Sequence, residues 1–91
     1  MQLSVVVPVL NEAGNIEPLL AELQSALDGG YDFEVLYVDD GSRDATVSVL
    51  EECRERYPQL QVIRHPETRG QTAALLSGVQ ATSRGWIATL D

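Results

Sequence analysis

The chain has 91 residues, of which 44% are hydrophobic, and its formal net charge is −8 from 14 acidic and 6 basic residues. This length suits one small domain with a modest core, and this composition is typical of a globular fold rather than a disordered chain. The surplus of acidic groups repels a phosphate backbone, so nucleic acid is not an expected partner.

The single cysteine, Cys53, excludes an intrachain disulfide and suits a reducing compartment. The first residues lack a basic region followed by a long apolar segment, and no stretch reaches the length that spans a bilayer. We therefore expect a cytoplasmic chain in which Cys53 is a buried helix residue.

The first half of the chain predicts a strand, a helix and a second strand. Residues 3–8 are rich in valine and are expected to form a buried strand. Leucines then recur at helical spacing from Asn15, the expected N-cap, until Gly29 and Gly30 end the pattern. A second apolar run over residues 33–38 predicts the next strand.

The second half continues the same alternation. Asp44 is expected to cap a helix that runs to Tyr57 and ends before a proline. A short strand over residues 60–64 precedes a helix over 70–82, and residues 86–90 form a last strand.

This order of elements implies right-handed crossovers and a mainly parallel sheet with helices on its faces. The predicted fold is therefore α/β, a Rossmann-like open sheet of four strands with three helices. Because the sequence stops directly after a strand, we expect residues 1–91 to be one part of a longer domain.

Polar residues follow the predicted strands. Asn11 and Glu12 come after the first strand, Asp39 and Asp40 end the second, and Asp91 ends the fourth. Parallel strands bring these groups to one edge of the sheet, where open α/β folds bind their ligands. Several carboxylates at one edge repel one another unless a cation or ligand hydroxyls compensate, although each group alone could serve a turn or a cap.

The residues of the turn after the first predicted strand limit which classes of ligand this edge could bind. A dinucleotide-binding fold needs a glycine-rich turn after the first strand, but this turn contains only Gly14, and no P-loop pattern is present. An acidic group at the end of the second strand suits a ribose hydroxyl or a base N–H, and one after the fourth strand could meet a pyrophosphate through a cation. The pattern favours a nucleotide bound without the usual phosphate loop over a dehydrogenase-like site.

Four segments carry a resemblance to a known family: VVVPVLNEAGNI, VLYVDDGSRDAT, RGQTAALLSGV and IATLD. In this order and spacing they resemble the N-terminal half of family 2 glycosyltransferases of the GT-A fold, and above all the dolichyl- or polyprenyl-phosphate sugar transferases. The resemblance implies a UDP- or GDP-sugar donor and transfer with inversion to an acceptor, expected to be a polyprenyl phosphate at the membrane surface.

Carried onto this sequence, the resemblance assigns the nucleotide-sugar site to the ends of the strands and the start of the third helix. Asp91 matches the first aspartate of the metal-binding Asp-x-Asp motif, which implies Mg²⁺ or Mn²⁺ once the whole motif is present. No catalytic residue is assigned, because the acceptor site and any catalytic base match positions beyond residue 91. The expected site residues are Pro8, Leu10, Asn11, Glu12, Asp39, Asp40, Arg69, Gly70, Gln71 and Asp91.

Other polar and small residues have plainer interpretations. His65, the one histidine, is expected to be a solvated turn residue. Ala74 and Gly78 are expected to let the third helix pack closely, whereas Gly70 could serve either packing or a phosphate.

An alternative from another class is a non-catalytic nucleotide-binding or interaction module. If the chain is a transferase fragment, it is expected to be inactive by itself, and its longer parent is expected to associate with the membrane. The open edge of the last strand predicts self-association, in the simplest case as a homodimer.

Overall fold

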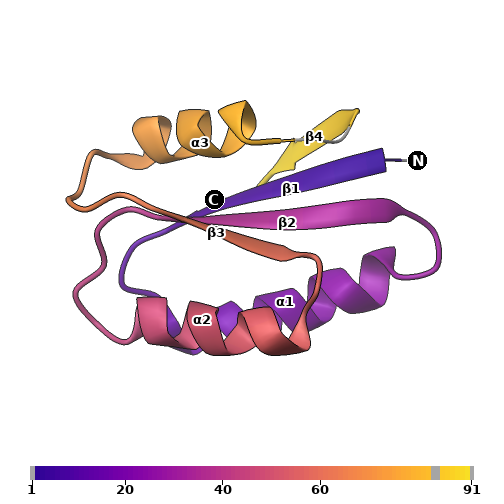
Figure 1. The fold of residues 1–91 in the computed structure, drawn as a ribbon, viewed down its shortest axis with the longest axis horizontal. Helices are drawn as coiled ribbons and strands as arrows, with labels where there is room; N and C mark the ends of the chain where they lie inside the picture. The colour runs from indigo at the N-terminus through magenta and orange to yellow at the C-terminus, as the bar shows by residue number, and fades with distance from the viewer. Residues whose placement is uncertain (1, 83–84, 91) are drawn as a thin grey trace.

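The computed structural model describes residues 2–82 and 85–90 and shows one open sheet with helices on both faces (Figure 1). All described strand pairs are parallel, and the sheet order is β3-β2-β1-β4. This confirms the predicted fold class. The strands are β1 (Gln2–Val9), β2 (Asp32–Asp39), β3 (Leu60–Arg64) and β4 (Trp86–Thr89).

Helices α1 (Ala13–Leu27) and α2 (Thr46–Arg56) lie together on one face of the sheet, and α3 (Gln71–Gln80) lies on the other. In Figure 1, α1 and α2 run below the strands and α3 runs above them. Within the described ranges, no helix has both the length and the apolar character needed to cross a membrane.

The central strands are buried on both sides, which explains why they read as continuous apolar runs. Along β1, Val5 and Val7 face the larger core under α1 and α2, whereas Val6 faces the smaller core under α3. This alternation is the period of two that a strand imposes. Cys53 is fully buried in the larger core, as the sequence predicts.

Pro8 lies in a central strand, where its missing N–H would normally break the ladder. The carbonyl of Val6 accepts a hydrogen bond from the Leu90 N–H, so alternate residues of β1 direct their backbone groups toward β4. Pro8 is two residues further on and therefore faces the same side. The register with β4 ends at Val6 opposite Thr89, so no described β4 residue needs a donor from Pro8.

Small residues let α3 lie directly on the sheet. A Cβ added to Gly78 would come within 2.3 Å of Val6 Cγ1 and 3.1 Å of Val38 Cγ2. Ala74, one turn earlier, is fully buried against the same strands. The predicted packing role of both residues is confirmed.

The start of α1 differs from its prediction. The helix begins at Ala13 rather than after Asn15, and Glu12 in the N-cap position makes no side-chain cap. Its first N–H groups are satisfied from another loop instead: the Glu12 N–H donates to Thr46 Oγ1 at 3.0 Å and the Ala13 N–H to Asp44 Oδ2 at 3.5 Å. The cap is therefore tertiary, and a search for local capping residues cannot find it.

The start of α2 also lies later than predicted, at Thr46. Asp44 nevertheless supports this helix, since its Oδ1 accepts the Thr46 N–H at 2.9 Å and also the Thr46 hydroxyl. Asp44 thus contributes to the first turns of both helices on this face of the sheet.

Candidate functional site

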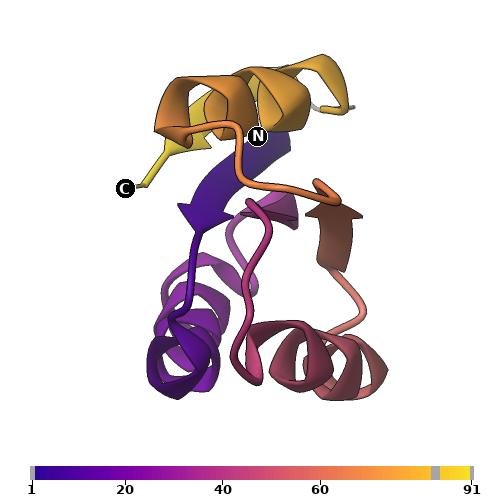
Figure 2. The same ribbon diagram turned by 90° about the vertical axis from the view of Figure 1, so that its left-hand side faces the viewer.

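Two loops meet where β1 and β2 end, at the edge of the sheet that faces the viewer in Figure 2. The Asn11 N–H donates to Ser42 Oγ at 2.8 Å, and Asn11 Oδ1 accepts the Arg43 N–H at 2.8 Å. Asn11 also has a φ of 54°, a left-handed conformation that asparagine tolerates better than most residues. The amide after the first strand therefore ties the β1–α1 loop to the β2–α2 loop.

The carboxylate of Asp40 joins this edge to the start of α3. Asp40 is 4% exposed, and its Oδ1 and Oδ2 accept the N–H groups of Arg69 and Gly70, each at 2.9 Å. Burial alone raises the pKa of the Asp40 carboxyl, but the bonds from Arg69, His65 and Gly70 stabilise the anion and hold the net pKa below its ordinary value. Asp40 is thus a buried anion held largely by backbone donors.

The structure contradicts the expectation for His65. This side chain is only 6% exposed, with Nδ1 at 2.9 Å from Asp40 Oδ1 and Nε2 at 2.8 Å from Ser77 Oγ. The prediction of a solvated turn residue was wrong because both partners come from distant parts of the sequence. No local pattern around a lone histidine indicates such partners.

The loop after β3 approaches the end of β2 closely at Gly41. This glycine has a φ of 82°, and an added Cβ would lie 2.6 Å from the backbone nitrogen of Thr68. At Gly70, where φ is 103°, no described atom lies within 4 Å of an added Cβ. Gly41 is therefore needed for close packing, whereas Gly70 supplies a backbone conformation beside open space.

These loops surround a cavity of about 200 Å³ at the carboxyl edge of the sheet. The cavity brings together six of the ten predicted site residues and adds Val9, Thr68 and Ala74, which the sequence reasoning missed. Ala74 could have been found, because it lies one helical turn after Gly70. The lining residues are Pro8, Val9, Leu10, Glu12, Asp40, Thr68, Gly70, Gln71 and Ala74.

The other predicted site residues have different places. Asn11 and Arg69 lie beside the cavity and do not line it, and Arg69 meets Asp40 through its backbone N–H. Asp39 is 1% exposed and accepts the Ser42 N–H on Oδ2, while its Oδ1 is buried without a hydrogen-bond donor among the described residues. Asp91 lies outside the described residues.

A metal site is not formed by the described part of the chain alone. Across residues 2–82 and 85–90, no three His, Cys, Asp or Glu side chains converge as cation ligands. The expected metal ligand, Asp91, is not among these residues. A role in cation binding therefore stays a prediction for that position.

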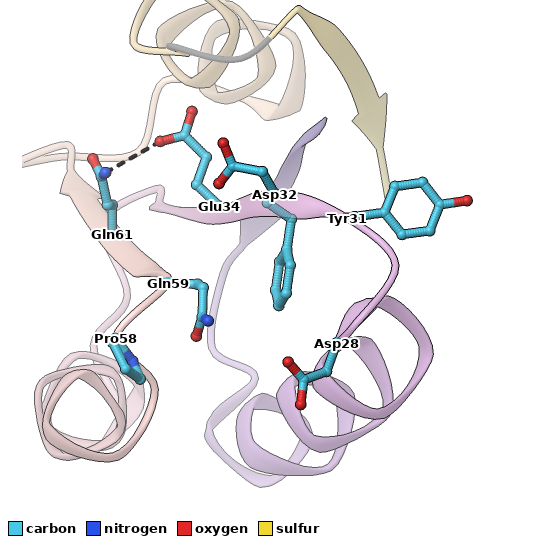
Figure 3. Close-up of a pocket in the computed structure, with 8 residues that line it drawn as sticks. Asp28, Tyr31, Asp32, Glu34, Pro58, Gln59 and Gln61 are labelled. Atoms are coloured by element: carbon cyan, nitrogen blue, oxygen red, sulfur yellow. Dashed lines mark hydrogen bonds between the residues drawn. The ribbon is translucent and has the colours of Figure 1, made fainter. Parts of the chain in front are cut away.

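A second cavity, of about 240 Å³, lies at the opposite edge, where β2 and β3 begin (Figure 3). Asp28, Asp32 and Glu34 contribute carboxylates to its lining. The buried Glu34 accepts hydrogen bonds from Ser4 Oγ at 2.6 Å and from Gln61 Nε2 at 3.1 Å. These bonds link neighbouring strands, so Glu34 supports the sheet at this edge.

Residues 4–91 match the sequence profile described as "Glycosyl transferase family 2". The chain belongs to this family. Membership agrees with the sequence analysis, in which the absence of a glycine-rich first turn disfavoured a dehydrogenase-like site.

Curated members of the family show the same similarity over nearly the whole chain. A dolichol-phosphate mannosyltransferase from Pyrococcus furiosus is 33% identical over 91 residues, which are 100% of this chain and 25% of that protein. An undecaprenyl-phosphate 4-deoxy-4-formamido-L-arabinose transferase from Pseudomonas aeruginosa is 38% identical over 90 residues, which are 97% of this chain and 26% of that protein. The chain thus spans about a quarter of the length of these relatives.

A solved structure shares the fold as well. The mannosyltransferase PcManGT from Pyrobaculum calidifontis, solved in complex with GDP-Man and Mn²⁺, superposes with a TM-score of 0.80 at 32% identity. The match covers 90% of this chain and 24% of that one. The four strands and three helices correspond to the N-terminal portion of the GT-A fold.

Proposed function

We propose that this chain is the nucleotide-sugar-binding part of a glycosyltransferase that transfers a sugar, with inversion, to a polyprenyl phosphate. The names of the relatives support this acceptor class, since two of them act on dolichol phosphate or undecaprenyl phosphate. Such an acceptor lies at a membrane surface, so the proposal places the protein at the cytoplasmic side of a membrane.

The cavity at the carboxyl edge is the observation that carries the proposal. It lies where open α/β sheets bind ligands and is bordered by the ends of β1 and β2 and by the first residues of α3. Asp40 offers an anionic acceptor suited to the N–H of a base or to a ribose hydroxyl. The open space at Gly70 lets a ligand approach the backbone at the start of α3.

A divalent cation belongs to the same proposal. When bound, Mg²⁺ or Mn²⁺ offsets the charge that builds on the leaving diphosphate. The described residues bind the nucleoside in this proposal, and Asp91 is the residue of this chain proposed as a metal ligand. PcManGT was solved with Mn²⁺, which supports a metal-dependent donor site in this family.

Nucleotide titration tests the site directly. UDP and GDP are added to the ¹⁵N-labelled chain in the presence and in the absence of Mg²⁺, and amide shifts are followed by NMR. Mg²⁺ is used because it is diamagnetic, whereas Mn²⁺ would broaden the signals. We expect the largest shifts at Leu10, Thr68, Gly70 and Gln71, with tighter binding when the metal is present. Shifts confined to the opposite cavity would refute this placement.

Asp40→Ala is compared with Asp28→Ala, a change at an exposed carboxylate, in the same titration. Both remove one carboxylate, but Asp28 lies at the opposite edge of the sheet. Loss of a charge-assisted hydrogen bond at Asp40 is expected to cost about 1.5–3 kcal/mol of nucleotide binding. Asp28→Ala is expected to leave binding unchanged. Equal affinities for the two variants would contradict the proposed role of Asp40.

Self-association is the remaining part of the proposal. Trp86 is 65% exposed, Ile87 44% and Leu90 36%, and β4 pairs only with β1 in the described sheet. An open strand edge with exposed apolar side chains favours pairing with a second copy. Sedimentation at several concentrations should show a dimer that Trp86→Lys weakens, and a monomer at high concentration would refute self-association.

The 91-residue chain alone is expected to transfer no sugar in a transfer assay.

A further inference from the structure

A hydrogen-bonded chain, buried at Asp40 and His65, runs from the cavity into α3. Asp40 lines the cavity, His65 lies behind it, and Ser77 on α3 completes the chain, with separations of 2.9 Å and 2.8 Å. The backbone N–H of His65 also donates to the backbone carbonyl of Asp39 at 2.8 Å, so the backbone of His65 is fixed to the end of β2. The imidazole therefore connects β2 to α3 directly behind the proposed nucleotide site.

The hydrogen bonds determine which atoms donate. An ionised carboxylate can only accept, so Nδ1 of His65 carries a proton and donates to Asp40 Oδ1. In a neutral ring, Nε2 then accepts from the Ser77 hydroxyl. Oδ1 of Asp40 already accepts the Arg69 N–H as well, whereas Oδ2 accepts only the Gly70 N–H among the described donors. Oδ2 is the oxygen with acceptor capacity to spare for a ligand.

We propose that His65 is a positioning residue of the nucleotide site, which holds the Asp40 carboxylate in place through Nδ1 and is itself oriented by Ser77. This inference rests on the proposed function of the cavity. It differs from that function in assigning a task to two residues that do not line the cavity. The orientation of Asp40 and the N–H groups of Arg69 and Gly70 are set before a nucleotide arrives, which lowers the ordering cost of binding.

The order Asp–His–Ser also occurs in hydrolases, where the serine is a nucleophile. Ser77 does not fit that role, because it lies inside α3 and lines neither of the two cavities described above. The chain of hydrogen bonds therefore acts on Asp40 rather than through Ser77.

Three substitutions test the proposal by nucleotide titration of the 91-residue chain with UDP and GDP. His65→Phe removes the Nδ1 donor and the Nε2 acceptor of the ring and is expected to weaken binding about tenfold, the effect of losing one hydrogen bond to a charged group. His65→Asn retains an amide N–H near the position of Nδ1 and is expected to bind within about threefold of the unmodified chain. Ser77→Ala removes only the orienting bond and is expected to weaken binding about twofold to threefold.

Ser4→Ala is the matched control, because it removes a buried hydrogen bond to Glu34 at the other edge of the same sheet. It is expected to lower thermal stability without changing nucleotide affinity. A loss of affinity in His65→Phe no larger than in Ser4→Ala would overturn the positioning role. If His65→Phe does not fold, Ser77→Ala decides the question by the same criterion.

A spectroscopic measurement separates positioning from general support of the fold. Imidazole ¹⁵N shifts should show Nδ1 protonated, and Ser77→Ala should move the Nε2 signal. The Arg69 and Gly70 amide signals should move in His65→Phe and return toward their original positions in His65→Asn. An unprotonated Nδ1 would overturn the proposal. A chain that binds no nucleotide would overturn the proposed function with it, whereas normal binding in His65→Phe would overturn the positioning role alone.

Discussion

Asp40 and Glu34 are buried carboxylates at opposite edges of the sheet, and different kinds of donor hold them. Glu34, 2% exposed, accepts from Ser4 and Gln61, whose side chains project from the neighbouring strands. Asp40 accepts from two backbone N–H groups of a loop and from a buried imidazole. Glu34 thus joins strands that already pair, whereas Asp40 binds the backbone of a loop that lies beside a cavity.

The comparison shows that the two ends of one parallel sheet can use their buried polar side chains differently. At the edge where β2 and β3 begin, side chains satisfy one another across regular strand pairs. At the edge where β1 and β2 end, side chains satisfy the backbone of neighbouring loops. Three predictions test this contrast, beginning with the largest expected effect.

Gly41 and Gly29 offer a matched pair of glycines, because both have a φ of 82°. Gly41→Ala adds a Cβ 2.6 Å from a backbone nitrogen, whereas an added Cβ at Gly29 meets no described atom within 4 Å. The left-handed conformation alone costs about 1–2 kcal/mol, and the collision adds roughly 1–3 kcal/mol. Urea unfolding should therefore show a loss of about 3–4 kcal/mol for Gly41→Ala and about 1 kcal/mol for Gly29→Ala. Equal losses would contradict the close loop packing.

The second-largest effect is expected when each of the two carboxylates is replaced by an amide, because the two replacements should lower the free energy of unfolding by different amounts. In Asp40→Asn the new NH₂ must face a backbone N–H, because each oxygen of Asp40 accepts one and neither donor can reverse. Glu34→Gln meets a hydroxyl and a side-chain amide, which can both exchange donor and acceptor roles. We expect unfolding free energies lower by about 2–3 kcal/mol for Asp40→Asn, and by about 1 kcal/mol for Glu34→Gln. The reverse order would refute the distinction between the two edges.

Acid should weaken the Asp40 edge by a smaller amount. Because the pKa of Asp40 is lower in the folded chain than in the unfolded one, its stabilisation is fully present above the unfolded pKa of about 4. It is lost as the pH falls through the lower, folded pKa. The difference in unfolding free energy between the unmodified chain and Asp40→Asn should therefore shrink as the pH falls below about 4. A difference that stays constant would show that ionisation of the Asp40 carboxyl does not stabilise the folded chain.

The strands were predicted to within two residues at each end because their physical signal is local. Apolar runs such as residues 3–8 and 33–38 are continuous since both faces of β1 and β2 are buried. The stripe of Ala74 and Gly78 likewise carries its packing role in its spacing. Burial patterns of this kind can be deduced from neighbouring residues alone.

The helix starts and the histidine could not be predicted in the same way, because their partners are distant in sequence. The N-terminus of α1 is satisfied by Asp44 and Thr46, more than thirty positions later. His65 lies 25 residues from Asp40 and 12 from Ser77. The sequence did indicate which segments meet at the cavity, through the family resemblance. It did not indicate which of their polar atoms bond to one another rather than face the cavity.

The shared cap between the β1–α1 and β2–α2 loops has a consequence for the order in which the chain gains structure. During synthesis, α1 leaves the ribosome before Asp44 and Thr46 do, so its first turn at that stage has no acceptors for the Glu12 and Ala13 N–H groups. That turn can become stable only after β2 has paired with β1 and brought the second loop beside it. In hydrogen exchange, the first turn of α1 and the loop from Ser42 to Thr46 should then open and close as one cooperative unit.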